Sequence, residues 1–101
     1  MNVLETVKQA KRIRHSALDG EINRLISAAR LGLIRAGVSE EKANSTDDGL
    51  IIEAIVAFVL ARLAETPELQ EKYEESWRIQ ADELRKSEGY RCTTISSNSE
   101  A

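Results

Sequence analysis

The sequence predicts an all-α protein, a small bundle of about four helices followed by a polar C-terminal tail. Ala, Leu, Glu, Arg and Ile are abundant among the 101 residues and there is one proline, a composition that favours helices. Apolar residues recur at spacings of three and four, and capping residues stand before these segments. We expect one helical domain over residues 1–89 and a tail over residues 90–101.

The first helix is expected between Asn2 and Arg12. Asn2 can act as its N-cap, and Glu5 stands three residues later, as in a capping box. The helix should end near Arg12, with Ile13 tucked under the chain as it turns.

The second helix is expected to begin at Ser16 and to run for about five turns. Ser16 is the expected N-cap, and Asp19 falls in the first turn, where the helix dipole favours negative charge. Gly37 should be the left-handed residue of a Schellman ending, with Val38 placed for the apolar contact of that motif.

The third helix is expected over residues 49–65, after a polar connection that can hold one helical turn at its start. Within the connection, Ser45 and Asp48 have the spacing of a cap. Between Leu50 and Ala61 only one residue is charged, so the helix is apolar nearly all round. It is too short to span a bilayer. Because the other helices of so small a chain cannot easily cover every side of it, we expect burial against another subunit.

The fourth helix is expected from Thr66, its N-cap, and Pro67, its first residue, to Gly89. Its apolar side is a narrow seam, which consists of Leu69, Tyr73, Trp77, Ala81 and Leu84.

Charge is distributed unevenly along the chain, whose net charge is −3. Residues 1–15 carry +3 and residues 65–88 carry −4. Such asymmetry indicates two faces that meet different partners or each other in a neighbouring copy, or else two solvated helix surfaces. The candidate subunit-interface residues are Leu31, Ile34, Phe58, Glu71, Glu74 and Glu75. The candidate contacts to a DNA backbone are Lys8, Lys11, Arg12 and Arg14.

The sequence argues against an enzyme and indicates no cofactor. His15, the single histidine, is interpreted as a turn residue, and no nucleophile motif, Gly-rich phosphate loop or metal-ligand spacing accompanies it. Glu53 is expected at an exposed helix edge or paired with an arginine such as Arg30 or Arg62. The lone Cys92 excludes an internal disulfide.

Three segments together resemble the head–tail connector (adaptor) proteins of tailed bacteriophages and prophages, a class also described as DNA-packaging proteins. They are "VKQAKRIRHSALDGEI", "LISAARLGLIRAGV" and "LIIEAIVAFVLARL", and the resemblance covers about residues 2–88. It implies a helical subunit of a ring, of about a dozen copies, that docks beneath the portal. The ring would extend the DNA channel without reading sequence and present a surface to a stopper or tail-completion protein.

The resemblance also implies a location at the head–tail junction of the virion, after assembly in the bacterial host cytoplasm and without a membrane. The basic residues of the first helix would then contact the portal or DNA, and the acidic fourth helix would face basic residues of the next copy or of the portal. Two alternatives remain open: a small helical DNA-binding protein, such as a regulator or a small terminase-like packaging subunit, and a generic helical interaction module.

Overall fold

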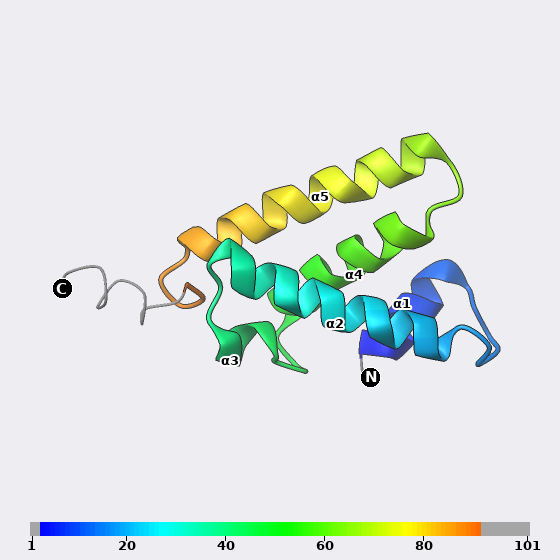
Figure 1. Ribbon diagram of the computed structural model, residues 1–101, viewed down its shortest axis with the longest axis horizontal. Helices are drawn as coiled ribbons and strands as arrows, with labels where there is room; N and C mark the ends of the chain where they lie inside the picture. Colours follow the sequence, from blue (N-terminus) through cyan, green and yellow to red (C-terminus); the bar gives the residue numbers. More distant parts are fainter. Residues whose placement is uncertain (1–2, 92–101) are drawn as a thin grey trace.

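The computed structural model describes residues 3–91 and is a small helical bundle (Figure 1). Four longer helices and one single turn confirm the predicted all-α fold. The helices are α1 (Val3–Lys11), α2 (Asp19–Ala36), α3 (Glu40–Ala43), α4 (Gly49–Leu63) and α5 (Pro67–Lys86). In Figure 1, α2 and α5 converge at their C-terminal ends and diverge toward the opposite end of the molecule, where α4 turns into α5.

Helix α4 is the centre of the bundle, because α1, α2 and α5 all pack against it. Ile51, Ile55 and Val59 have no exposed surface, and alanines on the other sides of the helix are also buried. The chain itself therefore covers most of α4, so the expectation that its burial requires another subunit is wrong for most of the helix. Exposed apolar surface on α4 is concentrated at Leu50, which is 59% exposed, and Phe58 is half-buried.

The starts of α4 and α5 follow local capping rules. Thr66 Oγ1 accepts a hydrogen bond from the Leu69 N–H at 3.2 Å, which confirms the predicted start of α5. For α4, Asp48 is the N-cap, and one of its carboxylate oxygens accepts the Leu50 N–H at 3.0 Å. Ser45 instead accepts the Asp48 N–H at 3.1 Å, so it stabilises the turn before the cap.

The predicted start of α2 is wrong by two residues. The helix begins at Asp19, and Leu18 occupies the N-cap position without a side-chain cap hydrogen bond. The Ser16 carbonyl, rather than its hydroxyl, takes part in the turn, since it accepts the Asp19 N–H at 3.2 Å. The Asp19 carboxylate lies 2.8 Å from Lys8 Nζ of α1. Asp19 therefore pairs with a residue of another helix, and the predicted capping box with Ser16 does not form. The expected cap of the first helix, Asn2, lies outside the described residues.

Both α1 and α2 end in the same hydrogen-bonding pattern. Gly37 has φ 117°, and the Val38 N–H donates to the Leu33 carbonyl at 3.0 Å, which confirms the predicted Schellman ending. In α1, the Ile13 N–H donates to the Lys8 carbonyl at 2.8 Å. The left-handed residue there is Arg12, with φ 60°, where a glycine is the usual choice.

The folded body extends past the expected boundary at residue 89. Helix α5 ends at Lys86, and the chain then turns so that the Tyr90 carbonyl accepts the Ser39 N–H at 2.7 Å. Arg91 forms an isolated antiparallel bridge with Val38. The first two residues of the expected tail therefore belong to the bundle, and the rest of that tail lies outside the described residues.

Candidate interaction groove

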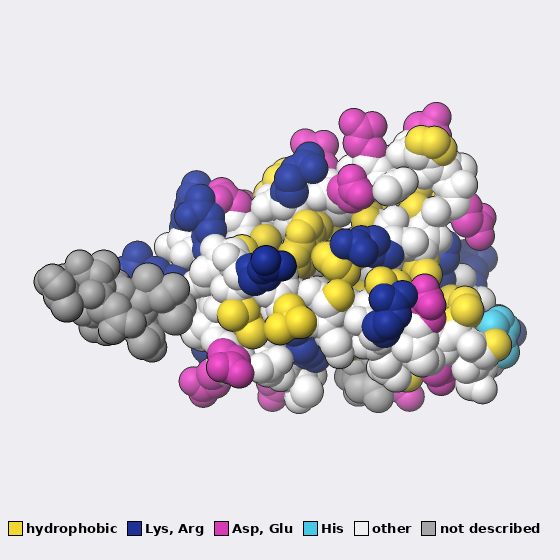
Figure 2. Space-filling view, viewed as in Figure 1, with side chains coloured by type: hydrophobic (Ala, Val, Ile, Leu, Met, Phe, Trp, Pro, Cys, Tyr) yellow, Lys and Arg dark blue, Asp and Glu magenta, His cyan; other side chains and the backbone are white. Residues whose placement is uncertain are grey.

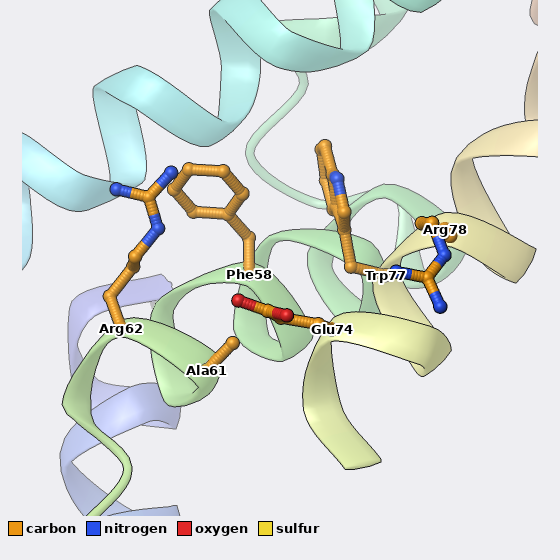
Figure 3. A pocket seen from close by; sticks show the side chains of 6 residues that line it. All are labelled: Phe58, Ala61, Arg62, Glu74, Trp77 and Arg78. Atoms are coloured by element: carbon orange, nitrogen blue, oxygen red, sulfur yellow. The ribbon is translucent and has the colours of Figure 1, made fainter. Parts of the chain in front are cut away.

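One hollow of the described surface lies between α4 and α5, on the side that faces α2. Its floor is formed by the Phe58 and Trp77 rings, whose centroids are 5.0 Å apart in an edge-to-face arrangement. Figure 3 shows how the side chains of the two helices meet there. The aromatic groove, as we call it, has a volume of about 170 Å³ and is lined by Phe58, Ala61, Arg62, Glu74, Trp77 and Arg78.

The position of Trp77 depends on a glycine of α2. A Cβ atom on Gly32 would lie 3.1 Å from Cζ2 of the indole, closer than ordinary van der Waals contact. Glycine at this position therefore allows the indole to lie close to the α2 backbone. A shallower hollow continues the groove toward the C-terminal ends of α2 and α5, past Ala36 and Ala81. Small residues thus keep the space between α2 and α5 open.

Arginines surround this apolar floor. The Arg62 guanidinium lies 4.5 Å from the centroid of the Phe58 ring, within the range of a cation–π contact. Arg78 lines both parts of the groove, and Arg85 lines the shallower part. Arg85 also forms an ion pair with Asp82 at 2.7 Å. Figure 2 shows Lys and Arg side chains on this face, around exposed apolar atoms.

Asp82 is held in its charged form by its neighbours. The hydrogen bond from Lys86, at 3.0 Å, and that from Arg85 lower the pKa of the Asp82 carboxyl, although partial burial acts in the opposite direction. Arg85 and Lys86 both pair with Asp82 and do not line the deeper part of the groove, whose charged lining residues are Arg62, Arg78 and Glu74.

The structure separates the predicted interface residues into groups. It brings together Phe58 and Glu74, which line the aromatic groove, and the Glu74 carboxylate accepts a hydrogen bond from Gln70 at 3.2 Å. Glu71 and Glu75 are exposed and do not line the groove. On α2, Leu31 is 61% exposed, whereas Ile34 is half-buried against the core.

Sequence reasoning missed Arg62, Trp77 and Gly32 as groove residues. Trp77 was expected in the seam that packs on the bundle, and it is half-buried there. The available signal was that Trp77 is the single tryptophan of the chain, a residue enriched at interaction surfaces.

The predicted basic cluster is divided as well. Lys8 pairs with Asp19, and Lys11 Nζ donates to the Leu63 carbonyl at 3.3 Å, at the C-terminal end of α4. Arg12 and Arg14 are exposed on the segment that follows α1. Two of the four predicted phosphate contacts therefore have structural roles, and two project into solvent.

A polar cluster fixes the end opposite the α4–α5 turn. The Tyr90 hydroxyl donates to Asp48. Burial opposes ionisation of Asp48, but the hydrogen bonds from Tyr90 and from the backbone N–H groups of Ile51 and Leu50 prevail and lower its pKa. The same hydrogen bond to Asp48, with burial, raises the pKa of Tyr90.

Arg30 is a second internal polar anchor. It donates to the carbonyls of Ala43 and Ser45, both at 2.8 Å, and its burial lowers the pKa of its guanidinium. Arg30 therefore connects the segment after α3 to α2 and is not the partner of Glu53. Glu53 is exposed, which agrees with the interpretation that it lies at the exposed edge of its helix.

His15 accepts a hydrogen bond from the Ala17 N–H at 3.2 Å in an exposed turn, in agreement with its interpretation as a turn residue. Across residues 3–91, the acidic and histidine side chains form no group of three that could hold a metal ion. None of the helices in this part of the chain is long and apolar enough to cross a membrane.

Comparison with protein-family models, with curated proteins and with solved structures found no match for this chain. The resemblance to connector proteins therefore rests on the sequence segments quoted above.

Proposed function

We propose that this chain is a structural subunit of a phage head–tail connector, which assembles head to tail with copies of itself into a ring. The observation that carries the proposal is that one subunit presents two unlike surfaces. One is the aromatic groove, whose charged lining residues are Arg62, Arg78 and Glu74, and the other is the exposed acidic side of the first half of α5, at Glu71 and Glu75. A head-to-tail ring requires two different, complementary surfaces on every copy.

In this role the protein needs neither a catalytic centre nor a cofactor. Its ring would lie beneath the portal, continue the DNA channel of the filled head and present a surface to a stopper or tail-completion protein. The place of function would be the head–tail junction of the virion, reached after assembly in the host cytoplasm. The resemblance of residues 2–88 to connector proteins supports this assignment.

Arg12 and Arg14 are the proposed contacts to the portal or to the DNA backbone. Both are exposed beyond the end of α1, whereas Lys8 and Lys11 are engaged within the subunit. Contacts of this kind would be made to phosphates or acidic side chains and would carry no sequence information.

Electron microscopy of the protein alone and mixed with the portal protein of the same phage or prophage tests the proposal. We expect rings of the protein alone, or rings bound coaxially to the portal in the mixture. A protein that forms neither species, at concentrations where both components stay soluble, would contradict a connector role.

The alternative is a small helical DNA-binding protein, for which exposed Arg12 and Arg14 are the relevant observation. It predicts salt-dependent binding of the isolated protein to duplex DNA. Since Lys8 and Lys11 stabilise the fold, the informative variant is Arg12→Gln with Arg14→Gln. Strong binding by the wild type that this variant abolishes would favour the alternative over the connector.

A further inference from the structure

We infer that the aromatic groove is a socket for a second copy of this chain, which inserts the acidic first half of its α5 with Leu69 as the apolar anchor. This inference rests on the proposed head-to-tail assembly and specifies its contact. Two properties of the socket and two of the inserted helix support it.

The socket combines apolar surface with a net positive charge, since Arg62 and Arg78 line it with one carboxylate, that of Glu74. Phe58 and Trp77 are both half-buried, so they present ring surface to an incoming side chain. The groove volume of about 170 Å³ is sufficient for an aliphatic side chain. Arg62 and Arg78 stand at the sides of the groove, where they can pair with carboxylates at the rim of a contact.

The inserted helix has the complementary character. Leu69 is 40% exposed in the first turn of α5, although it is a large aliphatic residue. Residues 65–75 carry five acids and one base. Two of these acids, Glu71 and Glu75, are exposed beyond Leu69. Figure 2 shows several Asp and Glu side chains along the edge that α5 forms, with Lys and Arg side chains among them and on the face below.

A single subunit cannot make this contact with itself. Leu69 and Trp77 stand eight residues apart on one continuous helix, about 12 Å along its axis. A helix cannot fold back on its own side, so only the acidic end of another copy's α5 can enter the groove. The contact is therefore heterologous, and each copy keeps one free socket and one free acidic end to continue the assembly.

Complementation between two variants tests the contact. The socket variant carries Arg62→Glu and Arg78→Glu, and the helix variant carries Glu71→Arg and Glu75→Arg. We expect each variant alone to self-associate at least about tenfold more weakly than the wild type in sedimentation velocity. An equimolar mixture should restore assembly, because the acidic end of the socket variant matches the intact socket of the helix variant, and the reversed charges match at the other contact. Combining all four substitutions in one chain should restore self-association.

Two further measurements keep the test independent of ring formation. The helix variant, which retains an intact socket, is labelled with 5-fluorotryptophan, and its single ¹⁹F resonance at Trp77 should shift when the socket variant is added. Leu69→Lys in the socket variant should abolish that shift. The matched control is Glu53→Arg with Glu83→Arg, which makes the same charge change at exposed sites on α4 and α5 and should leave self-association unchanged.

Several results would overturn the inference. One is a mixture that shows neither assembly nor a ¹⁹F shift, and another is self-association of either variant at wild-type strength. If rings persist in both variants, the socket assignment is wrong while the connector proposal stands. If the wild type forms no assembly alone or with the portal, the socket inference and the connector proposal are both wrong. If the socket variant instead loses binding to DNA, the groove arginines serve nucleic acid and the inference is wrong.

Discussion

The Tyr90 hydroxyl lies 2.8 Å from Oδ2 and 3.1 Å from Oδ1 of Asp48, and so joins two residues 42 positions apart. Asp48 is also the N-cap of α4, where it accepts the Leu50 and Ile51 N–H groups. The first residues beyond α5 therefore fix the start of the central helix. Lys42 adds to the cluster, since its Nζ lies 5.5 Å from the centroid of the Tyr90 ring.

Replacement of Tyr90 by Phe should reduce the free energy of unfolding by about 1–2 kcal/mol, because it removes a hydrogen bond to a charged carboxylate. Urea denaturation at neutral pH measures this change. Tyr73→Phe is the control, since Tyr73 is half-buried on α5 away from Asp48. Equal stability of the wild type and the Tyr90→Phe variant would show that the hydrogen bond contributes nothing.

The same pair predicts a pH dependence. The pKa of Asp48 is lowered from 3.8, so its contribution to stability is complete above that value and is lost as the pH falls through the lower, folded-state pKa. The pKa of Tyr90 is raised from 10.0, so its contribution is present below pH 10 and is lost as the pH rises through the higher value. Both dependences should be weaker in Tyr90→Phe, as unfolding curves at a series of pH values would show. Unchanged acid and alkaline profiles would contradict this prediction.

Arg12→Gly should be more stable than Arg12→Ala by about 1 kcal/mol, because only glycine adopts a left-handed conformation without a Cβ penalty. Both variants remove the same charge, so their difference isolates the backbone at φ 60°. Thermal unfolding followed by circular dichroism measures it. If Arg12→Ala were the more stable variant, Arg12 would not be strained.

Gly32→Leu should reduce the free energy of unfolding by about 1–3 kcal/mol, since its side chain must displace the Trp77 indole from α2. The emission of the single tryptophan should change in the same variant. Gly20→Leu, in the first turn of the same helix, has no atoms within 4 Å of its Cβ and should be tolerated. Similar losses in the two variants would indicate an effect of helix composition rather than of contact with Trp77.

A chain that ends at Gly89 should be less stable than one that ends at Arg91, by about 1–3 kcal/mol. The shorter chain loses the Tyr90 hydroxyl, the acceptor of the Ser39 N–H and the bridge between Val38 and Arg91. Chemical denaturation of the two truncated proteins checks the revised boundary. Equal stabilities would show that the folded domain ends at residue 89, as the sequence predicts.

Sequence reasoning succeeded where one local interaction decides the structure. Thr66 with Pro67, and Gly37 with Val38, were assigned correctly because their hydrogen bonds close within a few residues. It failed at Ser16, because the neighbouring Asp19 is engaged by Lys8 of another helix. A capping pattern contains no information about such a contact between helices.

The candidate groove was only partly predictable for the same reason. Phe58 and Glu74 were named from composition and charge, but their common position depends on how α4 and α5 pack. The role of Gly32 depends on the distance between α2 and Trp77, which no spacing within α2 encodes. Likewise, Tyr90 was assigned to the tail because its partners, Asp48 and Ser39, are distant in sequence.

The burial of α4 by its own chain has a consequence for the kinetics of the proposed ring assembly. Since Ile51, Ile55 and Val59 are already buried in the single subunit, a copy that joins a ring would arrive folded and dock as a rigid body. Little conformational entropy would be lost at each addition. Each contact can then be weak enough to dissociate, so an incorrectly placed copy can leave before the ring closes. Closure, rather than the strength of any single contact, would make the finished ring long-lived.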